Sequence, residues 1–182
     1  MLIGFAGFGG AGKTTAIEHL EHEGVGRRVY LGEAVSEEIK RRGVVRTPEI
    51  EKEVRMELRE RLGPSAFADL RSSHIAQLIR EGECVLIDAI FKLEEYGKLQ
   101  GCGQKRSVLI AIETSFDTRS QRLMARSNRG YNPDQLRLRD KIETEELGTS
   151  LVIEAAEFRV SNEGSLIDFY SNLSALWKRL VS

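Results

Sequence analysis

Near the start of the chain, glycines and a lysine are spaced as the binding of nucleotide phosphates requires. The pattern G-x-x-x-x-G-K-[ST] is met at every fixed position by the run Gly7-Phe8-Gly9-Gly10-Ala11-Gly12-Lys13-Thr14. Glycine lets the backbone adopt positive φ and brings N–H groups close to phosphate oxygens. A helix that begins where such a loop ends adds unpaired N–H donors and a partial positive charge. We interpret this loop as a site for a nucleoside triphosphate.

The residues of the loop have distinct chemical roles in this interpretation. The Lys13 ammonium would lie near the β- and γ-phosphates, and the Thr14 hydroxyl would ligate Mg²⁺. Backbone contacts to the phosphates would come from Gly7, Gly9, Gly10, Ala11, Gly12 and Thr15. The alternative is a glycine-rich turn between a strand and a helix that binds nothing. The complete match, placed between an apolar run and a helical pattern, argues against that alternative.

Apolar runs alternate with segments of helical period along the whole chain. The pattern predicts strands at residues 2–6, 28–31, 84–88, 107–112 and 158–160. It predicts helices at residues 14–23, 33–42, 48–62, 65–80, 93–99, 114–126, 134–147 and 166–180. Such alternation is typical of an α/β fold in three α/β/α layers, with a mostly parallel sheet of about five strands. We expect one domain over residues 1–182.

The composition narrows the class of protein. The 182 residues are 41% hydrophobic and 30% charged, which is the balance of a soluble globular domain. A net charge of −1 gives no general attraction to nucleic acid or membrane, and no apolar run approaches the ~20 residues of a membrane span. Two cysteines are too few for a disulfide framework. We expect a cytoplasmic protein, a monomer or a small homo-oligomer, without nucleic-acid or membrane partners.

Arginines are concentrated in the last third of the chain. Three of them share a helix face because they are three and four residues apart, and three more follow: Arg119, Arg122 and Arg126, then Arg129, Arg137 and Arg139. Mobile arginines stabilise a phosphoryl group in transfer and exclude water when they close over it. The alternative is a solvated face paired with Asp117, Asp140 and Glu143. The loop at residues 127–133 favours a lid, which we assign to residues 119–147.

Acidic residues stand where two predicted strands end. Asp88 closes the strand at residues 84–88, and Glu33 follows the strand at residues 28–31. In an open parallel sheet, ligands bind beyond the carboxyl ends of the strands. Asp88 would hold Mg²⁺ through a water, and Glu33 would accept a proton from the acceptor or bind the metal. The alternatives are a helix cap for Asp88 and an ordinary first-turn carboxylate for Glu33.

A turn at residues 161–165 joins the last predicted strand to the last helix. Asn162 and Gly164 in this turn could contact a nucleotide base through the backbone and the side-chain amide. The alternative is a plain turn followed by an N-cap. We interpret the three histidines His19, His22 and His74 as structural, because no cysteine or acidic residue stands at metal-ligand spacing from them.

Together these segments resemble the nucleoside monophosphate kinase branch of P-loop proteins, above all dephospho-CoA kinases and the dephospho-CoA-kinase-like and adenylate-kinase-like proteins of archaea. The likeness rests on Gly7 to Thr14, Gly32-Glu33, Lys40-Arg41-Arg42-Gly43, residues 57–63, residues 85–90, Glu94-Glu95, Thr118-Arg119 with Arg122 and Arg126, Arg139-Asp140 with Glu143, and residues 162–166. The resemblance implies transfer of the γ-phosphoryl group of ATP-Mg²⁺ to a small-molecule acceptor. It assigns Lys13, Thr14, Arg122 and Arg126 to the phosphates and Asn162 to adenine. The acceptor would lie against residues 33–80, with Arg55 and Arg59 available for its phosphate.

The chain departs from this family on the acceptor side. Ser36 stands where an arginine is common, and Asp88-Ala89-Ile90-Phe91 replaces the Asp-Gly-Ile-Arg of the archaeal relatives. Glu33 replaces an aspartate. The leading hypothesis is a kinase for dephospho-CoA, a nucleoside or deoxynucleoside monophosphate, or a related metabolite. The alternative is a nucleotide-binding regulatory or interaction protein without productive transfer.

Overall fold

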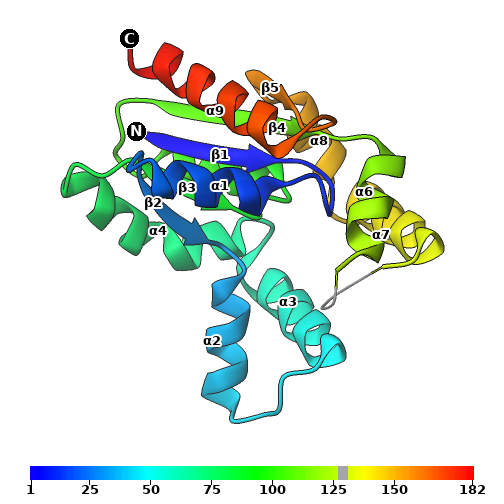
Figure 1. The fold of residues 1–182 in the computed structure, drawn as a ribbon. Helices are drawn as coiled ribbons and strands as arrows, with labels where there is room; N and C mark the ends of the chain where they lie inside the picture. The colour runs from blue at the N-terminus through cyan, green and yellow to red at the C-terminus, as the bar shows by residue number, and fades with distance from the viewer. Residues whose placement is uncertain (127–130) are drawn as a thin grey trace.

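The computed structural model describes residues 1–126 and 131–182 (Figure 1). Its sheet has five strands: β1 (Leu2–Ala6), β2 (Arg27–Tyr30), β3 (Val85–Asp88), β4 (Ser107–Glu113) and β5 (Phe158–Ser161). Their order is β2-β3-β1-β4-β5, and every neighbouring pair is parallel. The predicted α/β class with a parallel sheet of five strands is confirmed. Arg129 and part of the predicted loop at residues 127–133 lie outside the described residues.

The glycine-rich loop at residues 7–12, called the phosphate loop below, begins at the centre of the sheet. β1 lies between β3 and β4, with Gly4 opposite Ile87 on one side and Leu109 on the other. Because all the strands are parallel, their carboxyl ends meet at one edge. After β1 the chain passes to β2 on one side, and after β3 it crosses to β4 on the other side of β1. Ligands of open α/β sheets bind where the strand order reverses in this way. The loop at residues 7–12 follows β1 at that position.

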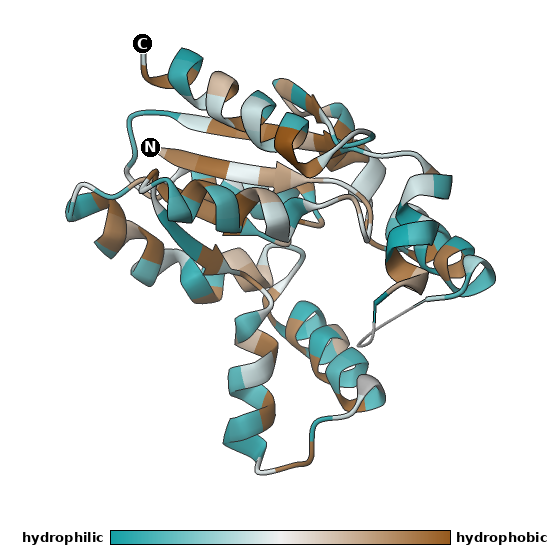
Figure 2. Ribbon diagram, viewed as in Figure 1, coloured by the Kyte–Doolittle hydropathy of each residue, from teal (hydrophilic) through white to brown (hydrophobic). Residues whose placement is uncertain are grey.

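Two apolar cores cover the two faces of the sheet. Alternate residues of β1 show the division: Leu2 and Ala6 lie in one core, and Ile3 and Phe5 lie in the other. Helices α1 (Lys13–His22) and α9 (Leu166–Val181) pack on the Ile3 face. The Leu2 face is covered by α4 (Ala66–Arg80), α5 (Leu93–Gln100) and α8 (Thr149–Glu154). The central strand β1 is accordingly apolar along its length, whereas the edge strand β2 includes Arg27 and Arg28 and is largely hydrophilic in Figure 2.

Two helix pairs extend beyond the carboxyl edge of the sheet (Figure 1). Helices α2 (Glu33–Arg42) and α3 (Pro48–Leu62) form one pair, and α6 (Phe116–Met124) and α7 (Pro133–Glu145) form the other. As predicted, Thr47 caps α3: its Oγ1 accepts from the Ile50 N–H at 3.3 Å. Asn132 and Gln135 form a reciprocal capping box that starts α7. These local signals position the helices that flank the phosphate loop.

The largest difference from the predicted elements lies before the last strand. The predicted helix at residues 134–147 ends at Glu145, and the six-residue helix α8 follows a turn at Gly148, whose φ is 75°. A helix this short spans fewer than two turns, so its apolar residues show no periodicity. Within residues 1–126 and 131–182, no helix combines the length and the hydropathy that crossing a membrane requires.

Candidate functional site

The loop between β1 and α1 has the backbone that its glycines permit. Gly7, Gly10 and Gly12 have φ values of 146°, 84° and 107°, which residues other than glycine rarely adopt. A Cβ at Gly7 would lie 2.8 Å from the Ile112 carbonyl oxygen, and one at Gly12 would collide with the side-chain amide of Asn162. The loop ends where α1 begins, so the unpaired N–H groups of the first turn of this helix adjoin the loop.

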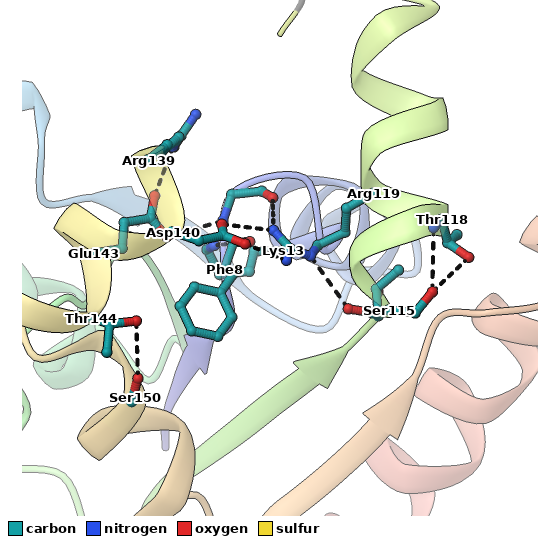
Figure 3. Close-up of polar contacts among 12 residues, drawn as sticks. Phe8, Lys13, Ser115, Thr118, Arg119, Arg139, Asp140, Glu143, Thr144 and Ser150 are labelled. Carbon is teal, nitrogen blue, oxygen red and sulfur yellow. Dashed lines mark hydrogen bonds and ion pairs between the residues drawn. The ribbon is translucent and has the colours of Figure 1, made fainter. Parts of the chain in front are cut away.

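Lys13 lies inside this loop. Its Nζ donates to the carbonyl oxygens of Gly7 at 2.5 Å and of Phe8 at 3.2 Å. Burial lowers the pKa of Lys13, and the carboxylates of Glu143 and Asp88 partly oppose that shift by raising it. The ammonium is therefore held on the loop by backbone oxygens that a phosphate group could replace. Figure 3 shows Lys13 among the charged side chains of α6 and α7.

The turn after β5 supports the loop from the side. Asn162 is 6% exposed, and its Nδ2 donates to the Ala11 carbonyl oxygen at 2.8 Å. Arg122, on α6, donates to two backbone carbonyl oxygens of the same turn, that of Asn162 at 2.8 Å and that of Gly164 at 3.4 Å. The structure thus brings the predicted base-contacting turn and one predicted phosphate-contacting arginine together beside the loop. The side-chain amide of Asn162 and the backbone carbonyl oxygens of Asn162 and Gly164 thus already have partners within the protein.

Arg119 is a buried link between three segments. It is 4% exposed and donates to the Gly9 carbonyl oxygen at 3.0 Å. Its guanidinium forms two bonds to Asp140 on α7, at 2.9 and 2.6 Å. Its spacing in the sequence placed Arg119 with the mobile arginines of a lid, but its contacts join α6, the loop and α7. Arg126 is exposed just beyond the end of α6.

Asp88 ends β3 beside the loop and has a basic partner. It is 4% exposed, and its Oδ2 accepts from Arg28 Nη2 at 2.6 Å. Arg28 comes from β2, the neighbouring strand, where Tyr30 pairs with Asp88. The sequence carried no signal for this pair, because the strand order and register that create it are tertiary properties.

The other predicted acid, Glu33, also faces an arginine. Glu33 is the first residue of α2, and its Oε2 lies 3.4 Å from Arg71 Nη2. The same nitrogen lies 2.9 Å from Glu37 Oε1, one turn further along α2. The Arg71 side chain reaches over from α4 and is 12% exposed. The sequence alone does not single out Arg71, because it is an ordinary charged residue of an amphipathic helix.

A buried carboxylate fixes the segment that follows β3. Glu95 is fully buried, and its Oε2 accepts from the backbone N–H groups of Phe91 at 2.9 Å and Lys92 at 3.3 Å. Arg59 of α3 donates to its Oε1 at 3.2 Å. Burial raises the pKa of Glu95, against the opposing effect of these N–H groups and of Arg59. Arg59, which the resemblance offered to the acceptor, is in this structure the partner of Glu95.

Ala89 has the backbone of a glycine. Its φ is 70°, the left-handed region, and it is 7% exposed directly after Asp88. We expect Ala89→Gly to raise the free energy of unfolding by about 1 kcal/mol, because glycine adopts this conformation without the Cβ clash. Urea denaturation of the two proteins measures the change. Ala66→Gly in helix α4 is the control, with a loss of stability expected there; a loss of similar size at Ala89 would contradict the assignment of strain.

Comparison with solved structures identifies the class of this fold. The chain superposes on a shikimate kinase from Bacteroides thetaiotaomicron with a TM-score of 0.59 and 16% identity, covering 100% of this chain and 99% of that one. A gluconokinase from Sinorhizobium meliloti gives a TM-score of 0.56 at 15% identity, covering 98% and 94%. The architecture is therefore the fold of small P-loop kinases. The likeness to dephospho-CoA kinases in particular stays a prediction.

Sequence relatives identify the family. The UPF0200 protein of Methanocaldococcus jannaschii is 32% identical over 186 residues, which cover 100% of this chain and 91% of that protein. The UPF0200 protein of Thermococcus sibiricus is 31% identical, with 99% and 95% covered. The chain belongs to the UPF0200 family. It spans 56% of a longer UPF0200/UPF0201 protein from Archaeoglobus fulgidus, at 33% identity. No protein-family model matches the chain.

Proposed function

We propose that this protein transfers the γ-phosphoryl group of ATP to a small anionic acceptor. The observation that carries the proposal is the phosphate loop at the carboxyl end of the central strand, with Lys13 held inside it by two carbonyl oxygens. Lys13 would neutralise charge on the transferring group. Arg122 of α6 and Arg126, which follows that helix, would assist, and catalysis would consist mainly of positioning and electrostatic stabilisation.

The residues beside the loop suit Mg²⁺. Thr14 presents an exposed hydroxyl on the first turn of α1, and Asp88 presents a carboxylate at the neighbouring strand end. Oxygen ligands of this kind, completed by water and phosphate oxygens, are those that Mg²⁺ prefers. When bound, the metal would withdraw negative charge from the β- and γ-phosphates. Arg28 binds Oδ2 of Asp88 and would hold this carboxylate in place beside the loop.

The acceptor would bind between the loop and helices α2 to α4. Arginines from three different elements lie around this region, each paired with a carboxylate: Arg28 with Asp88, Arg59 with Glu95, and Arg71 with Glu33 and Glu37. Among the described residues, the buried Nε atoms of all three have no hydrogen-bond partner. A phosphate or carboxylate on the acceptor would supply such partners. These arginines thus offer the positive charge that Ser36 and Phe91 do not.

Arg71 is the arginine we expect to matter most for the acceptor. Arg71→Ala should raise the KM for the acceptor by about 10- to 100-fold, the loss expected for one charge-assisted hydrogen bond. The KM for ATP should change little, because Arg71 lies on α4 against α2. Arg80→Ala, a change at the end of the same helix, is the control. Equal changes in both KM values would contradict an acceptor role.

A panel of acceptors tests the proposal. ADP release from ATP-Mg²⁺ would be followed with dephospho-CoA, the ribo- and deoxynucleoside monophosphates, shikimate, gluconate and no acceptor. The first two classes follow from the sequence resemblance, and the next two from the names of the structural neighbours. One acceptor should raise the rate far above the rate without acceptor. If no compound in the panel changes the rate, the proposal loses its main support.

The second candidate is a nucleotide-binding regulator that transfers nothing. It is favoured by one observation: Glu33, the candidate proton acceptor, already has Arg71 as an ion-pair partner. A carboxylate that is held in an ion pair is less free to contact the hydroxyl group of an acceptor. This candidate predicts ATP binding with the same slow hydrolysis in the presence and absence of every acceptor.

A further inference from the structure

The backbone N–H and carbonyl groups of Gly9, in the phosphate loop, both bind side chains from the helices of residues 119–147. Its N–H donates to Glu143 Oε2 on α7 at 3.1 Å. Its carbonyl oxygen accepts from Arg119 Nη1 at 3.0 Å. Glu143 is 134 residues away in sequence and only 3% exposed. A buried carboxylate of α7 therefore lies against a loop whose composition suits the binding of phosphate.

Arg139 completes this arrangement. Its Nε donates to Glu143 Oε1 at 2.7 Å, so the carboxylate accepts from the loop through one oxygen and from Arg139 through the other. The guanidinium also lies directly against the loop, since a Cβ at Gly9 would stand 2.7 Å from its Cζ. Figure 3 shows Arg139 and Glu143 together beside the loop. The pair is an anion and a cation placed where a nucleotide's phosphates would enter.

Charge makes the carboxylate and a phosphate mutually exclusive here. The Gly9 N–H can serve one acceptor well, and two anions a few ångströms apart at a poorly hydrated site repel each other strongly. Glu143 is also the largest of the charged influences on the pKa of Lys13, which it raises. The carboxylate therefore supplies to the loop part of what a bound phosphate would supply: an oxygen for the N–H and a negative charge near Lys13.

We infer that Glu143 is an internal competitor of the nucleotide: it occupies a phosphate position in the ligand-free chain, and its displacement leaves the Arg139 guanidinium to the incoming phosphates. The inference rests on the nucleotide site of the proposed function and makes no use of the transfer step. Its ligand class is a nucleoside triphosphate or a linear polyphosphate. The Arg119–Asp140 pair is separate from the exchange, because Arg119 contacts the carbonyl side of Gly9.

Glu143→Gln tests the inference through binding alone. Glutamine keeps the size of the side chain and an oxygen for the Gly9 N–H, but removes the negative charge. If Glu143 competes with the phosphates, this variant should have a Kd for ATP and for inorganic tripolyphosphate about tenfold lower than the unmodified chain. A change of this size is in the range of ordinary conformational coupling. The Kd for adenosine, which has no phosphate, should not change. Titration calorimetry on the full chain measures all three ligands.

Two further variants sharpen the comparison. Glu145→Gln removes the same charge from an exposed position on the same helix, and its Kd values should match those of the unmodified chain. Glu143→Ala removes the hydrogen bond as well as the charge. It should lower the melting temperature without ligand and increase the rise in melting temperature that tripolyphosphate produces.

The outcomes separate this inference from the proposed function. Weaker or unchanged ATP binding by Glu143→Gln, in a chain whose unmodified form binds ATP, would overturn the inference and leave the kinase proposal standing. Tighter binding without any acceptor-dependent transfer would support the inference and count against the kinase. Failure of both proteins to bind ATP or tripolyphosphate would overturn both.

Discussion

Lys13→Ala should abolish acceptor-dependent transfer, with a fall in rate of about 10³-fold, the loss seen when a central charge-stabilising donor is removed. Lys13 supplies the full positive charge of the phosphate loop, and its Nζ already lies within 3.2 Å of two loop carbonyl oxygens. Single-turnover ADP formation at saturating acceptor measures the change.

The stability of this variant provides the control. Burial lowers the pKa of Lys13, which means that the loss of hydration of this ammonium reduces the stability of the folded protein. Lys13→Ala should therefore unfold at the same temperature as the unmodified chain or a higher one. Lys141→Ala, an exposed change on α7, should leave the transfer rate unaltered. A Lys13→Ala protein that is folded and retains transfer within about tenfold would show that the reaction does not use this loop.

Arg119→Ala should destabilise the fold by about 3 kcal/mol, the cost of removing one partner from a buried ion pair. Arg119 is buried and joins Asp140, the Gly9 carbonyl oxygen and the Thr114 carbonyl oxygen. Its removal leaves the Asp140 carboxylate without this partner. Urea denaturation, followed by circular dichroism, measures the free energy of unfolding.

An exposed ion pair on the neighbouring helix α7 gives the comparison. Arg137 and Asp134 form an ion pair at 3.2 Å, with side chains 64% and 94% exposed. Arg137→Ala should cost less than about 1 kcal/mol, as is usual for solvated pairs. The double change of Arg119 to Met and Asp140 to Leu should recover much of the lost stability, because no charge is then left unpaired. Equal costs for Arg119→Ala and Arg137→Ala would refute the structural role of Arg119.

Local signals explain what the sequence could predict. Gly7, Gly12 and Lys13 are parts of one loop, and their chemistry is set by backbone conformation within a few residues. Thr47 and Asn132 cap helices through bonds to residues three positions away. The strands β1, β3 and β4 at the centre of the sheet are mainly apolar runs, which is the pattern of strands buried on both faces. The fold class and the position of the glycine-rich loop could therefore be predicted from composition and spacing, and nucleotide binding by that loop stays a prediction.

Some charged contacts of the site could not be predicted, because they depend on tertiary packing, whereas pairing of the arginines with Asp140 and Glu143 was one of the two interpretations of the sequence. Arg28 meets Asp88 through strand order, and Glu143 meets Gly9 through the docking of α7. Arg119 illustrates the limit: its spacing from Arg122 correctly placed both on one helix, but spacing does not show which helix face is buried. The positive φ of Ala89 also went unpredicted, because alanine itself carries no signal for that conformation.

The fate of the γ-phosphate of ATP tests the central claim most directly. The chain would be incubated with Mg²⁺ and ATP carrying ³²P in the γ position, with each acceptor of the panel in turn. Products would then be separated, with Lys13→Ala as the blank. The proposed function predicts that the label moves to one anionic acceptor, with no more inorganic phosphate than the blank releases. Label that stays in ATP, or appears only as inorganic phosphate whatever the acceptor, would contradict it.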